Sequence, residues 1–132
     1  MAITPHTADI VVKDMAASLA FYRLLGLEMP AVADQEEGPV NYEPGHGMAL
    51  GFFSEAMMAH SPLGWVAPVG QRISIAFKAG SPAEVDAVYA AVEAAGHKAA
   101  MAPVDSPYGQ RYACLRDPDG NRVDVFADIP PG

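Results

Sequence analysis

Two helix-forming segments, each preceded by one strand-like segment and followed by several more, most strongly constrain how these 132 residues fold. The first helix is predicted to begin after Asp14, whose carboxylate can accept from a free backbone N–H, and to end at Gly26. The second begins at Ser81-Pro82-Ala83-Glu84, a capping box with proline at the first helical position, and ends at Gly96. The two halves read alike, so one domain of two similar modules is expected.

Side chains alternate in the segments before both helices, which predicts a strand in each. The apolar side chains expected to pack under the helices are Ala8, Ile10 and Val12 in the first strand and Ile73, Ile75 and Phe77 in the second. The opposite face is expected to carry Thr7, Asp9 and Val11 in the first strand and Arg72, Ser74 and Ala76 in the second. A sheet covered by helices on one side leaves its other side to line a cleft.

Further strands are expected near residues 27–30, 38–43, 47–53, 98–103, 110–116 and 121–127. A turn at Asp117-Pro118-Asp119-Gly120-Asn121 joins the last two, with glycine where a positive φ is needed. Residues 54–70 are rich in proline, glycine and apolar side chains, so they are interpreted as an irregular linker that folds over the cleft.

Charge and composition exclude several classes of partner. A formal net charge of −8 argues against nucleic acid, because binding to phosphates depends on lysine and arginine. The N-terminal residues lack a signal peptide pattern and no stretch is long enough to span a bilayer, so we expect a cytoplasmic protein that does not associate with membranes. The lone cysteine, Cys114, excludes an internal disulfide and is expected to be a small buried strand residue.

Two further segments resemble signatures of a known family. VKDMAASLAFY (Val12 to Tyr22), followed by Leu25-Gly26-Leu27, resembles the N-terminal signature of the glyoxalase/bleomycin resistance/dioxygenase superfamily, also called the vicinal-oxygen-chelate (VOC) superfamily. Tyr108-Gly109-Gln110-Arg111 and LRDPDGNRVDVF (Leu115 to Phe126) resemble its C-terminal signature. The resemblance spans nearly the whole chain.

This resemblance implies an α+β fold of two βαβββ modules that form a concave sheet cleft, with the helices on the outer face. We expect one VOC domain over residues 1–132, with module 1 at about 4–55, the linker at 54–70 and module 2 at about 71–128. A homodimer with the cleft near its interface is also implied. The resemblance does not imply one particular function, because the superfamily includes metal-dependent lyases, dioxygenases, epimerases and metal-free antibiotic-binding proteins.

Metal-dependent members place His, Glu or Gln on the first strand of each module and Glu on the last. Carried over by register, these positions fall on Thr7, on Arg72 or Gln71, and on Asp124, while the last strand of the first module, HGMALGFF, has no acid. An arginine at one corner would oppose a cation, so only Asp124 suits a metal. We expect no metal cofactor, although a slipped register would bring in His6, and the loop residues His46 and His60 stay open as ligands.

Without a metal, the expected site is a cleft lined by polar strand residues and rimmed by aromatic ones, which is typical of a small-molecule pocket. The candidates on the strands are Asp9, Arg72, Ser74, Asp124 and Phe126, and those nearby are Phe52, Trp65, Tyr108, Arg111 and Tyr112. Trp65 suits either a stacking wall for a planar ligand or a dimer interface. Tyr108 and Arg111 suit either ligand contact or pinning of the final hairpin, and the face of Phe52 depends on the strand register.

The leading hypothesis is a binding protein of the bleomycin-resistance type that sequesters an aromatic or amphipathic natural product and so confers antibiotic resistance, with no catalytic residue and no cofactor. The alternative is a metal-dependent glyoxalase-type lyase or an extradiol dioxygenase that acts on vicinal oxygens. A third possibility is an interaction subunit with a vestigial cleft.

Overall fold

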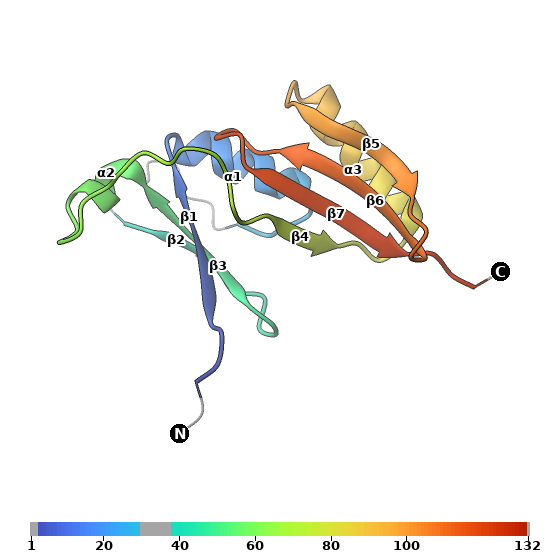
Figure 1. Cartoon of the computed structure of the whole chain (residues 1–132), viewed down its shortest axis with the longest axis horizontal. Helices are drawn as coiled ribbons and strands as arrows, with labels where there is room; N and C mark the ends of the chain where they lie inside the picture. Colours follow the sequence, from blue (N-terminus) through green and yellow to red (C-terminus); the bar gives the residue numbers. More distant parts are fainter. Residues whose placement is uncertain (1–2, 30–37, 132) are drawn as a thin grey trace. The chain divides into compact units, whose positions relative to one another are not determined.

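The computed structural model describes residues 3–29 and 38–131, and the chain divides into two compact units, Met1–Ala67 and Pro68–Gly132 (Figure 1). The division falls within the segment 54–70 that the sequence marks as a linker. Each unit has its own sheet, one of three strands and one of four, and its own helices. The fold is therefore α+β, as predicted.

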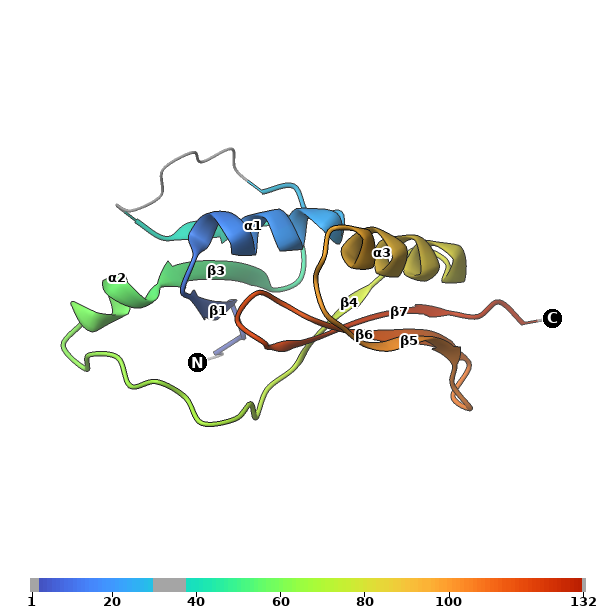
Figure 2. The same ribbon diagram turned by 90° about the horizontal axis from the view of Figure 1, so that it is seen from above.

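The first unit contains β1 (Thr7–Val12), α1 (Met15–Leu24), β2 (Val40–Tyr42), β3 (Ala49–Ser54) and the short α2 (Glu55–Ala59). Its strand order is β1-β3-β2, with β1 parallel and β2 antiparallel to β3. Figure 2 shows α1 lying along one face of this sheet. The other face of the sheet is turned away from α1.

The core of the first unit lies between α1 and the sheet. Its buried apolar side chains are Ile10, Val12, Met15, Leu19, Phe21, Tyr22, Val40, Leu50 and Phe52. The burial of Ile10 and Val12 confirms the predicted inward face of the first strand. Phe52 is 0% exposed and its ring lies 5.2 Å from that of Tyr22.

Both helices begin and end where the sequence predicts. Asp14 accepts from Ala17 N at 3.1 Å, and Gly26 follows α1 with a φ of +93°. In the second unit Ser81 Oγ accepts from Glu84 N at 3.3 Å. The Glu84 carboxylate accepts from Gly80 N at 2.6 Å, one residue before the position that a capping box implies.

The second unit contains β4 (Ile75–Lys78), α3 (Pro82–Ala94), β5 (Ala99–Asp105), β6 (Gln110–Arg116) and β7 (Arg122–Asp128). This βαβββ sequence is the predicted one, and the strand order is β4-β7-β6-β5. β4 is parallel to β7 and the other pairs are antiparallel. In both units, therefore, the first strand runs parallel to the last.

The helix α3 covers one face of the four-stranded sheet (Figure 2). The buried side chains of this core are Val85, Val92, Ala113, Leu115, Val123, Val125 and Ala127. The turn between β6 and β7 is organised by the buried Asp117, which accepts from Asp119 N at 3.0 Å and from Asn121 N at 2.8 Å. Gly120 has a φ of +86°, which confirms its predicted role in the turn.

Three local predictions differ from the structure. Residues 27–29 form no strand, because Leu27 N bonds back to Tyr22 O at 3.4 Å and so closes the end of α1; residue 30, the end of that predicted strand, lies outside the described residues. The segment 54–70 is not wholly irregular, since Ser54 caps α2 through Met57 N at 3.1 Å. The strand expected from residue 72 begins at Ile75, which leaves Arg72, Ile73 and Ser74 in the segment before it, and Ile73 is exposed instead of packing under the helix.

None of the helices in the described part of the chain combines the length and the hydropathy that crossing a bilayer requires.

Replacing Phe52 tests the register of β3. Phe52→Ala is expected to lower the free energy of unfolding by about 3–5 kcal/mol, because it empties the space beside Tyr22. Phe53→Ala is the matched control: Phe53 is half-buried on the opposite face, and its loss should cost about 1 kcal/mol. Urea unfolding of both variants measures the difference, and a larger loss for Phe53→Ala than for Phe52→Ala would place the strand one residue out of register.

Candidate functional site

The face of the four-stranded sheet that is turned away from α3 carries the main cluster of polar and aromatic side chains in the second unit. Neighbours in the strand register point to the same side of a sheet. The register pairs Cys114 with Asp124, Tyr112 with Phe126, Ala76 with Asp124, Met101 with Cys114 and Val104 with Tyr112. We call this surface, with Arg122 at the start of β7, the distal face.

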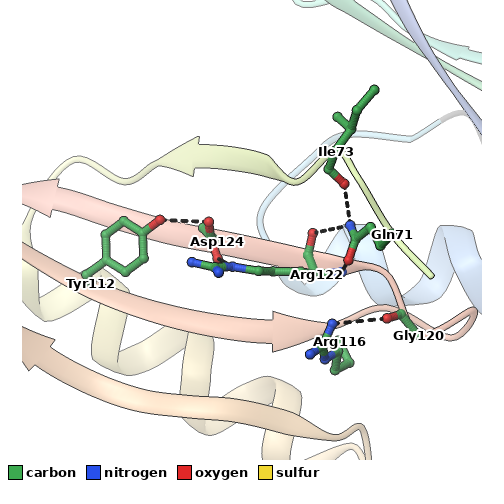
Figure 3. A network of polar contacts seen from close by, with 7 residues as sticks. All are labelled: Gln71, Ile73, Tyr112, Arg116, Gly120, Arg122 and Asp124. Atoms are coloured by element: carbon green, nitrogen blue, oxygen red, sulfur yellow. Dashed lines mark hydrogen bonds and ion pairs between the residues drawn. The ribbon is translucent and has the colours of Figure 1, made fainter.

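Asp124 is the centre of the distal face. Its Oδ1 accepts from Arg122 Nε at 2.8 Å and its Oδ2 accepts from Tyr112 OH at 2.7 Å (Figure 3). The side chain of Asp124 is 4% exposed, whereas that of Arg122 is 46% exposed. A buried carboxylate is stable only when it is paired, and here both of its oxygens have a donor.

The network sets the protonation of its members. Burial raises the pKa of Asp124, but the hydrogen bonds from Arg122, Tyr112 and Cys114 outweigh it and hold the pKa below its ordinary value. Burial, followed by Asp124, raises the pKa of Tyr112, and the same two causes raise the pKa of Cys114. At neutral pH the face therefore holds a carboxylate, a guanidinium, a neutral phenol and a neutral thiol.

Gln71 holds the backbone of Arg122 at both of its polar groups. Gln71 Oε1 accepts from Arg122 N at 2.7 Å, and Gln71 Nε2 donates to Arg122 O at 3.3 Å (Figure 3). Gln71 Nε2 also donates to Ile73 O. The side-chain amide thus substitutes for a strand at the beginning of β7, which explains why β4 starts only at Ile75.

Aromatic and apolar groups flank this network. The rings of Tyr112 and Phe126 are stacked, with centroids 6.3 Å apart and planes at 26°. On the neighbouring edge strand, Met101 and Val104 are 37% and 45% exposed. The distal face therefore combines an apolar surface with a cation.

In the first unit, Asp9 lies on the sheet face turned away from α1. Its carboxylate lies over Gly51 of the neighbouring strand, where a Cβ would collide with Asp9 Oδ1. The same Cβ would come within 3.3 Å of both Asn41 Oδ1 and Phe53 Cε2. Gly51 therefore makes room for an acid that lies across the sheet.

Trp65 is tied to the short helix α2. Its Nε1 donates to Glu55 Oε2 at 2.9 Å, and its side chain is half-buried. The linker is thus anchored at this residue, and one part of the indole stays exposed.

The other predicted site residues lie elsewhere. Phe52 packs in the core of the first unit, on the face opposite Asp9, so its side chain supports the fold instead of lining a cleft. Arg111 points to the α3 side, where it binds Asp86 at 2.8 Å and Asp105 at 2.9 Å and so joins β6 to α3 and β5. Tyr108 is 87% exposed in the turn before β6.

Of the residues predicted from the sequence, the structure brings together Tyr112, Asp124 and Phe126. Arg72 and Ser74 are exposed and precede β4. Sequence reasoning missed Arg122 and Cys114 as members of the site, and considered Gln71 only as a metal ligand. Period-two alternation from Asp124 back to Arg122, and from Tyr112 on to Cys114, is the signal that identifies the first two.

The residues of the distal face do not fit a metal centre. Across residues 3–29 and 38–131, no three His, Cys, Asp or Glu side chains gather closely enough to hold an ion. Asp124, the best candidate ligand, has the Arg122 guanidinium 2.8 Å from its Oδ1, and that charge would repel a divalent cation.

A family model, the Glyoxalase/Bleomycin resistance protein/Dioxygenase superfamily, matches residues 4–125. The chain belongs to this superfamily. No curated protein is a significant match.

Solved structures resemble the chain over nearly its full length. One is lactoylglutathione lyase from Agrobacterium tumefaciens, at 28% identity and a TM-score of 0.68 over 94% of this chain and 92% of the other. Another is a glyoxalase/bleomycin resistance protein from Albidiferax ferrireducens, at 27% identity and a TM-score of 0.69 over 98% of this chain and 100% of the other. TioX from Micromonospora is similar in fold, at 15% identity and a TM-score of 0.66 over 96% of this chain and 99% of the other.

Stability should depend on pH through Asp124. Because the pKa of Asp124 in the folded protein lies below its unfolded value of about 4, its charge stabilises the fold above about pH 4. That stabilisation is lost as the pH falls through the folded pKa. Asp124→Asn should therefore destabilise the protein by about 1–3 kcal/mol at pH 7, and by progressively less below about pH 4.

Urea unfolding of both proteins between pH 7 and pH 2.5 measures this difference. Asp128→Asn is the control, because Asp128 lies on the same strand and has a lowered pKa beside Lys78, but both side chains are largely exposed. Its effect should be smaller at every pH. A difference between wild type and Asp124→Asn that stays constant with pH would contradict the network.

Proposed function

We propose that this protein binds a small aromatic or amphipathic natural product and sequesters it without chemical change, as metal-free bleomycin-resistance proteins do. In this proposal it confers antibiotic resistance, acts in the cytoplasm as a homodimer with its cleft near the interface, and needs no cofactor.

The observation that carries the proposal is the state of Asp124. This acid is the best candidate for a metal ligand, yet both of its oxygens are bound by Tyr112 and Arg122. The stacked rings of Tyr112 and Phe126 beside it offer the kind of surface on which a planar molecule stacks. The distal face therefore supports binding better than metal chemistry.

A panel of aromatic natural products, titrated calorimetrically into the protein, tests the proposal. At least one compound should bind saturably, and mass spectrometry should recover it unchanged. Phe126→Ala should weaken its binding about tenfold, because a stacking surface is lost. Ile3→Ala, which truncates an exposed apolar side chain of the first unit, should leave the affinity unchanged.

Fluorescence of Trp65, the chain's one tryptophan, gives a second readout. Quenching by the compound that binds in the calorimeter would show that binding changes the surroundings of Trp65. An absence of binding by every compound, in both measurements, would instead favour the interaction subunit.

Similarity to lactoylglutathione lyase favours one alternative, a metal-dependent lyase or dioxygenase. Elemental analysis of protein purified without chelators separates the two functions. We expect less than stoichiometric Ni, Zn, Fe and Mn. One equivalent of any of these metals per chain, or turnover of a bound compound, would overturn the binding proposal.

A further inference from the structure

The ion pair on the distal face is asymmetric in its exposure. The Asp124 side chain is 4% exposed and the Arg122 side chain is 46% exposed, so the cation is the member that reaches solvent. The net charge of −8 would by itself favour a cationic ligand. At this surface the exposed member of the pair is the guanidinium, which favours an anionic group on the ligand.

Arg122 also keeps hydrogen-bond donors available. A guanidinium has five N–H groups in a planar fork that matches a carboxylate. Within the described residues, Nε–H is given to Asp124 and the group also interacts with the Tyr112 hydroxyl. The remaining N–H groups of the terminal nitrogens have no hydrogen-bond acceptor in that part of the chain.

The guanidinium is held in place before any ligand arrives. Asp124 holds the side chain from the same strand, two residues further along β7, and Gln71 holds the backbone N–H and C=O of Arg122. Figure 3 shows the Arg122 side chain running along β7 from Gln71 towards Asp124 and Tyr112. An arginine that is fixed in this way loses little further freedom on binding.

The surface beside the guanidinium is aromatic and apolar. Tyr112 and Phe126 stack at 6.3 Å, and the exposed Val104 is the cross-strand neighbour of Tyr112. A ligand that matches both features has a planar ring system and one anionic group at its edge.

We propose that the distal face binds planar aromatic carboxylates, whose anionic group pairs with the terminal nitrogens of Arg122 while the ring lies against Tyr112 and Phe126. Gln71 is a positioning residue, which acts through the backbone of Arg122. This inference rests on the proposed function and narrows it to one class of ligand.

Three matched probes test the ligand class: 2-naphthoate, 2-naphthamide and 2-naphthylmethylammonium, which share a ring system and differ in charge. Calorimetric titration should give about tenfold tighter binding of naphthoate than of naphthamide, and the weakest binding for the ammonium compound. In Arg122→Gln, naphthoate and naphthamide should bind within about twofold of each other. Arg23→Gln removes the same charge from the last turn of α1, and should keep the tenfold preference.

Two further variants separate position from charge. Arg122→Lys keeps the charge but loses the planar fork, so its preference for naphthoate should be intermediate. Gln71→Ala should weaken the binding of naphthoate without weakening the binding of naphthamide. A merely structural role of Gln71 would weaken the binding of both compounds equally.

The outcomes distinguish this inference from the proposed function. Equal binding of naphthoate and naphthamide, tighter binding of the ammonium compound, or a preference that survives Arg122→Gln overturns the inference and leaves the binding function standing. If natural products bind and naphthoate does not, the inference is likewise overturned and the binding function still stands. If no compound of either set binds, the proposed function fails and this inference fails with it.

Discussion

A carboxylate buried in a sheet has to keep its hydrogen-bond donors, and the second unit is built around that requirement. Asp124 as a whole residue is 3% exposed. The loss of Arg122 or Tyr112 would therefore leave its charge with no solvent to replace the lost donor. Arg122 lies on the same strand as Asp124, whereas Tyr112 lies on β6, so the hydrogen bond from Tyr112 links β6 to β7 beyond the backbone ladder. The same requirement orients the guanidinium and sets the protonation of the nearby phenol and thiol.

Both units place an acid beside a small residue of the neighbouring strand, but the acid is on opposite strands of the pair. Asp9 and Ala76 each lie six residues before the first residue of the following helix, Met15 and Pro82. In the first unit the acid is on the first strand and pairs with Gly51 on the last, whereas in the second Ala76 pairs with Asp124. In the first unit the Asp9 carboxylate lies over Gly51, whereas in the second Asp124 is bound by Tyr112 of β6, on the side of β7 away from Ala76.

Much of this architecture could be predicted because its causes are local. The caps at Asp14 and Ser81, the turn at Gly120 and the alternation around Ile10 each lie within a few residues of the sequence. The candidate site was harder to predict, because it depends on pairings between residues that are distant in the sequence. The sequence predicts Arg72 as an anchor on the sheet and gives no such role to Arg122. Because β4 starts only at Ile75, Arg72 lies off the sheet, whereas Gln71 holds the backbone of Arg122. The side to which Phe52 points depended in the same way on register.

The contact between Gln71 and Arg122 spans 51 positions of the chain. It joins the segment that enters the second unit to the beginning of its final strand, so the unit is latched where its chain starts. A fragment that begins at Ile75 would contain every described strand and helix of this unit and still lack this contact.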